Sequence, residues 1–134
     1  MSDGEPQVQG GDGFAVASLD DLGQGPGFRK IRTPLGVTAF GVNAIVLPPG
    51  YETGSHFHDE QEELYFVHSG EVEFEFGDGS TARLGPGGLA RVDAATPRRV
   101  RNLSDSEEAT YVVIGGKGGY VGRDGRLAEG ETHR

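Results

Sequence analysis

The chain has 134 residues, no cysteine and a formal net charge of −9 at pH 7. This length fits one domain with a buried core, and the lack of cysteine excludes disulfides, zinc–thiolate sites and cysteine nucleophiles. The negative charge argues against nucleic acid or an anionic membrane surface as a partner. No stretch resembles a secretory signal or approaches the ~20 apolar residues of a membrane span, so the expected compartment is the cytoplasm.

The N-terminal residues 1–13 are rich in Gly, Asp, Glu and Gln, with almost nothing to bury, and are expected to form a disordered arm. Ordered chain is expected to begin at Phe14. A short helical turn is expected over residues 18–22, where Ser18 could cap it, and the glycines that follow should end it.

Residues 71–76 alternate Glu with Val or Phe, which predicts a strand with Val72, Phe74 and Phe76 on its core face. Turn residues flank this segment, so residues 63–67, 72–76 and 80–84 predict an antiparallel meander. Further strands are expected at residues 28–31, 37–47, 89–92, 99–103 and 110–114. Short strands at this spacing, with 24 glycines and no long helical pattern, predict an all-β fold, a small β-barrel or double-sheet jelly roll over residues 14–114.

The last residues, 115–134, are Gly-rich and charged, with few apolar anchors. They are expected to form a tail that wraps the outside of the barrel or frays.

Candidate metal ligands occur in one short segment. In an extended strand His56 and His58 lie on the same face, because side chains alternate between faces. The polar residues 59–62 can reverse the chain, so Glu63 can open an adjacent antiparallel strand and face the same point. Two imidazoles and one carboxylate are the ligand set of many non-haem iron sites. The segment therefore predicts a site for one divalent transition metal ion: iron, manganese, nickel, copper or zinc.

The same residues resemble the cupin superfamily. The series Gly50, five residues, His56, one residue, His58, four residues, Glu63, six residues, Gly70 is similar to the first cupin motif. Residues 97–102 resemble the second motif, except that Arg98 stands where the family has histidine. The resemblance spans residues 37–114 and implies a barrel of six or eight strands that dimerises and holds a divalent metal near one open end.

By this resemblance His56, His58 and Glu63 carry over as metal ligands, while Arg98 replaces the fourth. A protonated guanidinium cannot coordinate a metal. Two outcomes are open. In one, the metal binds the three ligands and Arg98 turns toward the mouth to hold an anionic substrate group. In the other, Arg98 forms a bidentate ion pair with Glu63 and displaces the ion, leaving a metal-free pocket for an anion.

The candidate substrate-binding residues are Arg98, Tyr65, Phe40 and Tyr111. Tyr65 could equally belong to the core, and for Phe40 and Tyr111 a core position is the first expectation. No catalytic residue is identifiable. The first hypothesis is a metal-binding cupin, a dioxygenase-like enzyme acting on a small anionic organic molecule. The alternative is a non-catalytic cupin that binds an anion or sugar, with Arg98 in place of the ion. A third alternative is metal-free acid–base chemistry by His56 or His58.

Overall fold

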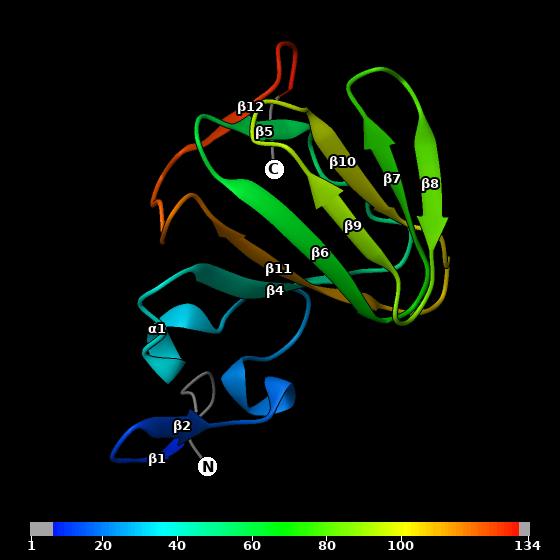
Figure 1. The fold of residues 1–134 in the computed structure, drawn as a ribbon. Coiled ribbons are helices and arrows are strands. Elements are labelled where there is room, and N and C mark those ends of the chain that lie inside the picture. Colours follow the sequence, from blue (N-terminus) through cyan, green and yellow to red (C-terminus); the bar gives the residue numbers. More distant parts are fainter. Residues whose placement is uncertain (1–6, 132–134) are drawn as a thin grey trace.

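The computed structural model describes residues 7–131, and its architecture is two five-stranded antiparallel sheets that face each other (Figure 1). One sheet has the order β12 (Gly125–Leu127), β5 (His56–His58), β10 (Arg98–Asn102), β7 (Val72–Phe76) and β8 (Thr81–Leu84). The other has the order β3 (Gly27–Lys30), β4 (Gly41–Leu47), β11 (Ala109–Gly116), β6 (Glu62–Ser69) and β9 (Leu89–Val92). The predicted all-β jelly roll is confirmed.

The core lies between the two sheets, and the inward side chains of alternating strands such as β6 and β7 help to fill it. On β6, Tyr65 and Val67 are buried while their neighbours are exposed, and on β7, Val72 and Phe74 are fully buried. The ring of Tyr65 lies 5.1 Å from that of Phe74 and 5.8 Å from that of Tyr111, measured between centroids. This aromatic cluster packs between the two sheets and forms much of the core.

Gly70 joins β6 to β7 and explains why the first motif ends in glycine. Its φ is +80°, in the left-handed region that other L-residues rarely adopt. A Cβ at this position would lie 2.7 Å from Cβ of Ala109. Backbone conformation and lack of space therefore both require glycine here.

Asn102 lies at the end of β10, where its side-chain amide contacts neighbouring backbone groups. Its nitrogen Nδ2 lies 3.2, 3.0 and 2.8 Å from the carbonyl oxygens of Leu47, Pro48 and Glu107. Its oxygen Oδ1 accepts the backbone N–H of Ser104 at 2.9 Å. The amide thus connects the end of β10 to the neighbouring loops, a connection that the alternation of residues along the strands does not predict.

The N-terminal part differs from expectation in three places. Of the expected disordered arm, residues 1–6 lie outside the described residues, but β1 (Gln9–Gly11) pairs with β2 (Phe14–Val16). A 3-10 helix, η1 (Leu19–Leu22), follows, and Ser18 makes no side-chain capping bond to it. The strand expected over residues 37–47 begins only at Gly41, after a short helix, α1 (Arg32–Leu35).

The C-terminal segment is part of the barrel over much of its length. Residues 115–116 extend β11, and β12 adds a strand beside β5, with Gly125 opposite His58 and Leu127 opposite His56. Strand pairing and polar side chains hold this segment, and neither appears in the sequence as a run of apolar residues.

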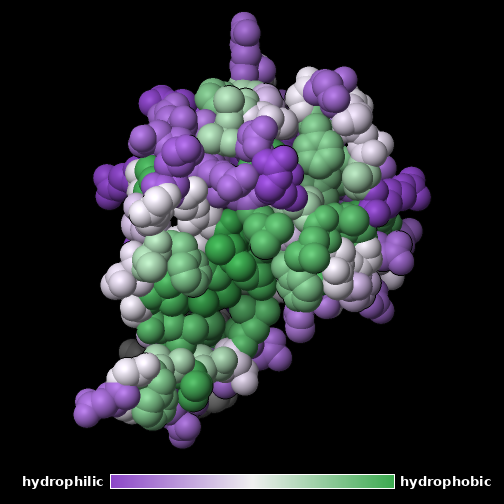
Figure 2. All heavy atoms as spheres, viewed as in Figure 1, coloured by the Kyte–Doolittle hydropathy of each residue, from purple (hydrophilic) through white to green (hydrophobic). Residues whose placement is uncertain are grey.

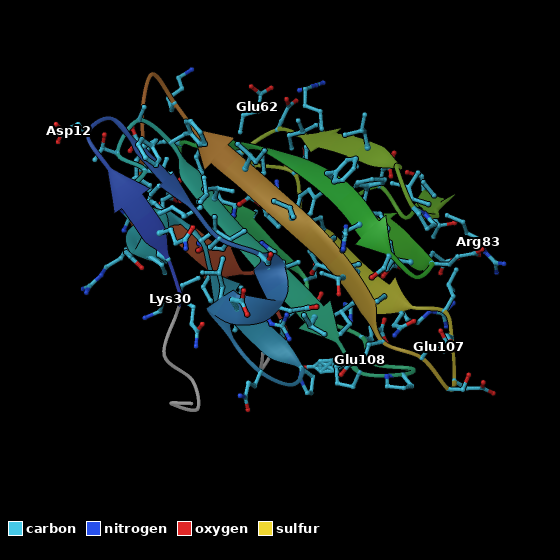
Figure 3. All side chains as sticks on the ribbon, turned by 90° about the horizontal axis from the view of Figure 1, so that it is seen from below. Asp12, Lys30, Glu62, Arg83, Glu107 and Glu108 are labelled. Atoms are coloured by element: carbon cyan, nitrogen blue, oxygen red, sulfur yellow. The ribbon has the colours of Figure 1, made fainter. Side chains whose placement is uncertain are left out.

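The outer face of the β6 sheet carries exposed apolar side chains. Leu64 and Phe66 are each 39% exposed, and Leu89 on the neighbouring β9 is 60% exposed. Figure 2 shows apolar atoms gathered over this part of the molecule, with hydrophilic residues around them. Seen from below, Glu62, Arg83 and other labelled charged side chains project outward from the sheets (Figure 3).

No described helix is long and apolar enough to span a membrane. The homodimer implied by the family resemblance stays a prediction.

Candidate metal centre

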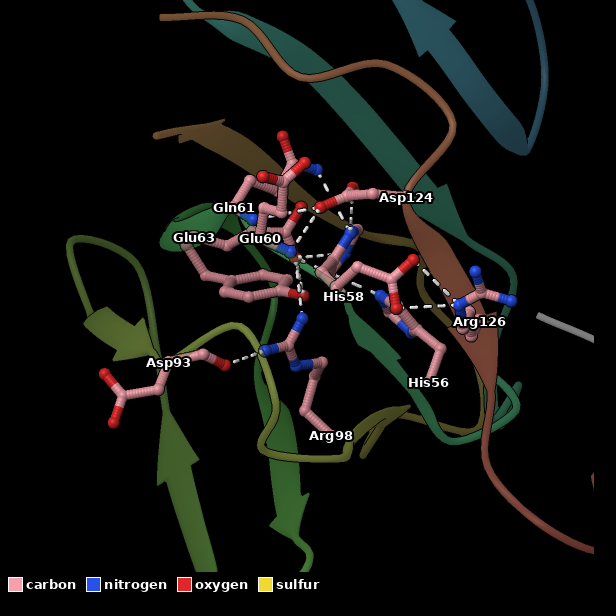
Figure 4. Close-up of polar contacts among 11 residues, drawn as sticks. His56, His58, Glu60, Gln61, Glu63, Asp93, Arg98, Asp124 and Arg126 are labelled. Carbon is pink, nitrogen blue, oxygen red and sulfur yellow. Dashed lines mark hydrogen bonds and ion pairs between the residues drawn. The ribbon is translucent and has the colours of Figure 1, made fainter. Parts of the chain in front are cut away.

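His56, His58 and Glu63 converge at the open end of the barrel (Figure 4). Strand β5 supplies both histidines and β6 supplies the glutamate. The Nε2 atoms of His56 and His58 lie 3.9 and 3.1 Å from Oε1 of Glu63, and candidate ligand atoms of all three residues lie within 4.8 Å of one another. Two imidazole nitrogens and a carboxylate at this spacing fit one divalent transition metal ion.

His58 is oriented by Asp124, which precedes β12. Its Nδ1 lies 2.8 Å from Oδ1 of Asp124, and the other oxygen of that carboxylate accepts the backbone N–H groups of Glu60 and Gln61 at 3.0 and 2.9 Å. An ionised carboxylate only accepts, so the contact with Asp124 favours a proton on Nδ1 of His58, which also has Nε2 of Gln61 at 3.1 Å. Nε2 of His58 faces Glu63. Nε2 is the atom that a metal would use.

The protonation of His58 depends on its two carboxylate neighbours. Burial alone would lower its pKa, but the contacts with Glu63 and Asp124 raise the pKa above its ordinary value. A metal ion would take the place of the proton on Nε2, because a ligating imidazole must be neutral.

Arg98 is fully buried and lies against Glu63. Its Nη1 donates to Oε1 of Glu63 at 3.0 Å, and its Nη2 donates to the carbonyl oxygen of Asp93 at 2.6 Å. The hydroxyl of Tyr65 donates to the same Oε1 at 2.7 Å. Burial alone would raise the pKa of Glu63, but His58, Tyr65 and Arg98 hold the pKa below its ordinary value, so the carboxylate is ionised.

The structure thus places Arg98 differently from either outcome considered from the sequence. It pairs with Glu63 through a single hydrogen bond and not as a bidentate fork. All the Glu63 contacts named above use Oε1. Among residues 7–131, this leaves Oε2 available to an ion, and the donor set fits a metal despite the guanidinium beside it.

A cavity of about 660 Å³ opens beside these ligands. Tyr65 and Tyr111, two of the candidate substrate-binding residues, line it together with the three candidate ligands. Of the other expected substrate-binding residues, Phe40 is 43% exposed and Arg98 is buried behind Glu63, and neither is among the described residues that line the cavity. Phe40 is outside because it belongs to the segment before β4, which runs along the surface.

Sequence reasoning missed the residues that the C-terminal segment brings to the site. Tyr120, Val121, Arg123 and Asp124 all line the cavity. Strand alternation carries no signal here, because the segment is irregular and rich in glycine. Asp124 is only 6% exposed in the structure. In the sequence it lies in a charged stretch, where an aspartate is expected to be solvated.

Comparison with models of known protein families identifies the family of the chain. A family profile described as a cupin domain matches residues 43–115, which is more than half of the chain. The protein therefore belongs to the cupin family. None of the curated proteins compared with the chain matches it significantly.

Several solved structures are similar. An uncharacterized conserved protein with a double-stranded beta-helix domain from Klebsiella pneumoniae has 24% identity and a TM-score of 0.71, over 85% of this chain and 96% of that one. A sugar phosphate isomerase of the cupin superfamily from Silicibacter pomeroyi has 25% identity and a TM-score of 0.63, over 76% and 64%. The DMSP lyase DddQ from Ruegeria pomeroyi has 26% identity and a TM-score of 0.60, over 69% and 46%, so this chain spans less than half of that protein.

Proposed function

We propose that the protein is a metal-dependent enzyme that acts on a small organic anion, with His56, His58 and Glu63 holding one divalent transition metal ion. The observation that carries the proposal is the meeting of both Nε2 atoms with the Glu63 carboxylate at the wall of the cavity. A bound ion would supply either Lewis-acid polarisation of a carbonyl or oxygen activation of the dioxygenase type. The ligand types do not choose among iron, manganese, nickel, copper and zinc.

Metal content is the first test. Purified protein should hold near-stoichiometric divalent metal by elemental analysis, and His56→Ala and Glu63→Ala should each lose most of it, because two ligands hold an ion far less well than three. His68→Ala is the matched control, since this histidine is exposed on the outer side of β6. Protein that takes up no metal even after reconstitution would refute the proposal.

The cavity suits a substrate with an apolar body and one anionic group. Its wall is mostly apolar and aromatic, and the exposed residue Arg123, which makes no ion pair within residues 7–131, also lines it. Arg123 has a φ of +57°, which a non-glycine residue rarely adopts and which is a feature that clusters at ligand sites. The similar isomerase from Silicibacter pomeroyi is named for a sugar phosphate, a small organic anion. Arg123 thus takes the role that sequence reasoning assigned to Arg98.

Arg123→Gln should weaken the binding of small organic anions by at least about tenfold, since a charge-assisted hydrogen bond contributes roughly 1.5–3 kcal/mol. Titration calorimetry with sugar phosphates and 2-oxo acids measures this. Arg126→Gln is the matched control, because Arg126 pairs with Asp59 outside the cavity. Equal affinities in wild type and Arg123→Gln would contradict the assignment.

Oxygen consumption separates the two chemistries. The iron- or copper-loaded protein is incubated with enols, diketones, catechols and thiols, and uptake of oxygen supports the dioxygenase-like activity. No uptake with any of them, together with turnover of a carbonyl substrate by the manganese, nickel or zinc form, supports Lewis-acid chemistry.

The second candidate function is a metal-free binding protein for an anion or a sugar. The contact from Arg98 to Glu63 favours it, because the guanidinium already compensates the carboxylate charge that a metal would otherwise balance. Metal analysis decides between the two candidates.

A further inference from the structure

We infer that the C-terminal segment of residues 120–131 is a strap that completes the metal centre, and that its Asp124 is a positioning residue for His58. The inference rests on the proposed metal binding and extends it to a part of the chain outside the cupin motifs. Three sets of contacts carry it.

The first set fixes the Asp124 carboxylate. Its Oδ2 receives two backbone N–H groups from the turn between β5 and β6, at 3.0 Å from Glu60 and 2.9 Å from Gln61. Its Oδ1 faces Nδ1 of His58 at 2.8 Å. A carboxylate held in this way offers a directed acceptor to the imidazole, which sets the tautomer and keeps the ring turned toward Glu63.

The second set docks the strap on the strand that supplies both histidines. In β12, Gly125 pairs with His58 and Leu127 with His56. Nε of Arg126 lies 2.7 and 2.8 Å from the two carboxylate oxygens of Asp59.

The end of the strap is anchored in the same way. Glu131 accepts the backbone N–H of Ser55 through Oε1 and a guanidinium N–H of Arg99 through Oε2, both at 2.9 Å. The strap therefore lies along the metal-binding strand from one end to the other, and it is held by strand pairing and by charge.

The third set concerns the cavity. Tyr120, Val121 and Arg123 of the strap form part of the cavity wall, next to the ligands. The guanidinium carbon of Arg32 lies 3.9 Å from the ring centroid of Tyr120. This cation–π contact connects this part of the strap to α1. Docking of the strap and binding of the ion favour the same arrangement of His58, so each should stabilise the other.

The test is metal affinity in the isosteric variant Asp124→Asn. Titration of the metal-free protein with Co(II), followed by visible absorption, should give a dissociation constant 10–100-fold higher than that of wild type, which is the usual effect of losing such an outer contact. Asp59→Asn is the matched control. It removes an exposed carboxylate that holds the same strap through Arg126 but does not touch His58, and its affinity should stay within about twofold of wild type, because surface ion pairs contribute little.

Hydrogen exchange provides a second readout. Co(II) should slow amide exchange in β12 of wild type and of Asp59→Asn, and should slow it much less in Asp124→Asn. Unchanged Co(II) affinity in Asp124→Asn would overturn the inference. Equal losses of affinity in Asp124→Asn and Asp59→Asn, with lowered thermal stability of both metal-free proteins, would also overturn it, because they would show only a structural role. Lack of Co(II) binding by wild type would instead refute the proposed function itself.

Discussion

Arg98→His should tighten binding of divalent metal by at least about tenfold. Residue 98 lies directly opposite His56 in the pairing of β10 with β5, and the cupin motif has histidine at this position. The substitution adds an imidazole ligand and removes a guanidinium that contacts Glu63. Repulsion between a guanidinium and a divalent ion ~4 Å apart is roughly 8 kcal/mol at an effective dielectric of ~20, so even partial relief has a measurable effect.

Competitive titration with Mn(II), Co(II) and Zn(II) measures this change. Arg101→His is the matched control, because Arg101 is on the same strand but points outward and pairs with Glu73. Its metal affinity should equal that of wild type. Unchanged or weaker binding in Arg98→His would mean that residue 98 does not reach the ion.

Arg98→Met should lower the free energy of unfolding of the metal-free protein by about 3 kcal/mol. Arg98 is fully buried, and its removal takes one donor from the Glu63 carboxylate and the Nη2 donor from the Asp93 carbonyl. The remaining partners of Glu63, His58 and Tyr65, compensate only part of this loss. Urea unfolding at pH 7 with a chelator present measures the change.

A double-mutant cycle tests whether this loss of stability comes from the pair of Arg98 and Glu63. The variant that combines Arg98→Met with Glu63→Gln should be more stable than the two single effects predict, with a coupling of about 1–3 kcal/mol, because it no longer buries an uncompensated charge. Arg101→Met, which removes a surface ion pair, should cost less than about 1 kcal/mol. Additive effects in the cycle would show that Arg98 stabilises the fold by packing and not by its charge.

The sequence by itself determined the fold class and the three candidate ligands. Alternation along residues 71–76 depends only on the two-residue period of a strand, and the strand formed where it was expected, Val72–Phe76. His56 and His58 share a face for the same local reason, and the short turn after them brings Glu63 to the same point. Such features follow from backbone geometry within a few residues, and a sequence displays them directly.

Only the tertiary structure decided what surrounds those ligands. Asp124 reaches His58 across 66 positions of the chain, and the direction of Arg98 depends on Glu63 and the Asp93 carbonyl, which belong to other segments. Phe40 and Arg98 were expected at the cavity wall, but the path of the backbone brings Arg123 there instead. Contacts between distant segments depend on how strands pair and loops close, and the local residue pattern does not predict which segments pair.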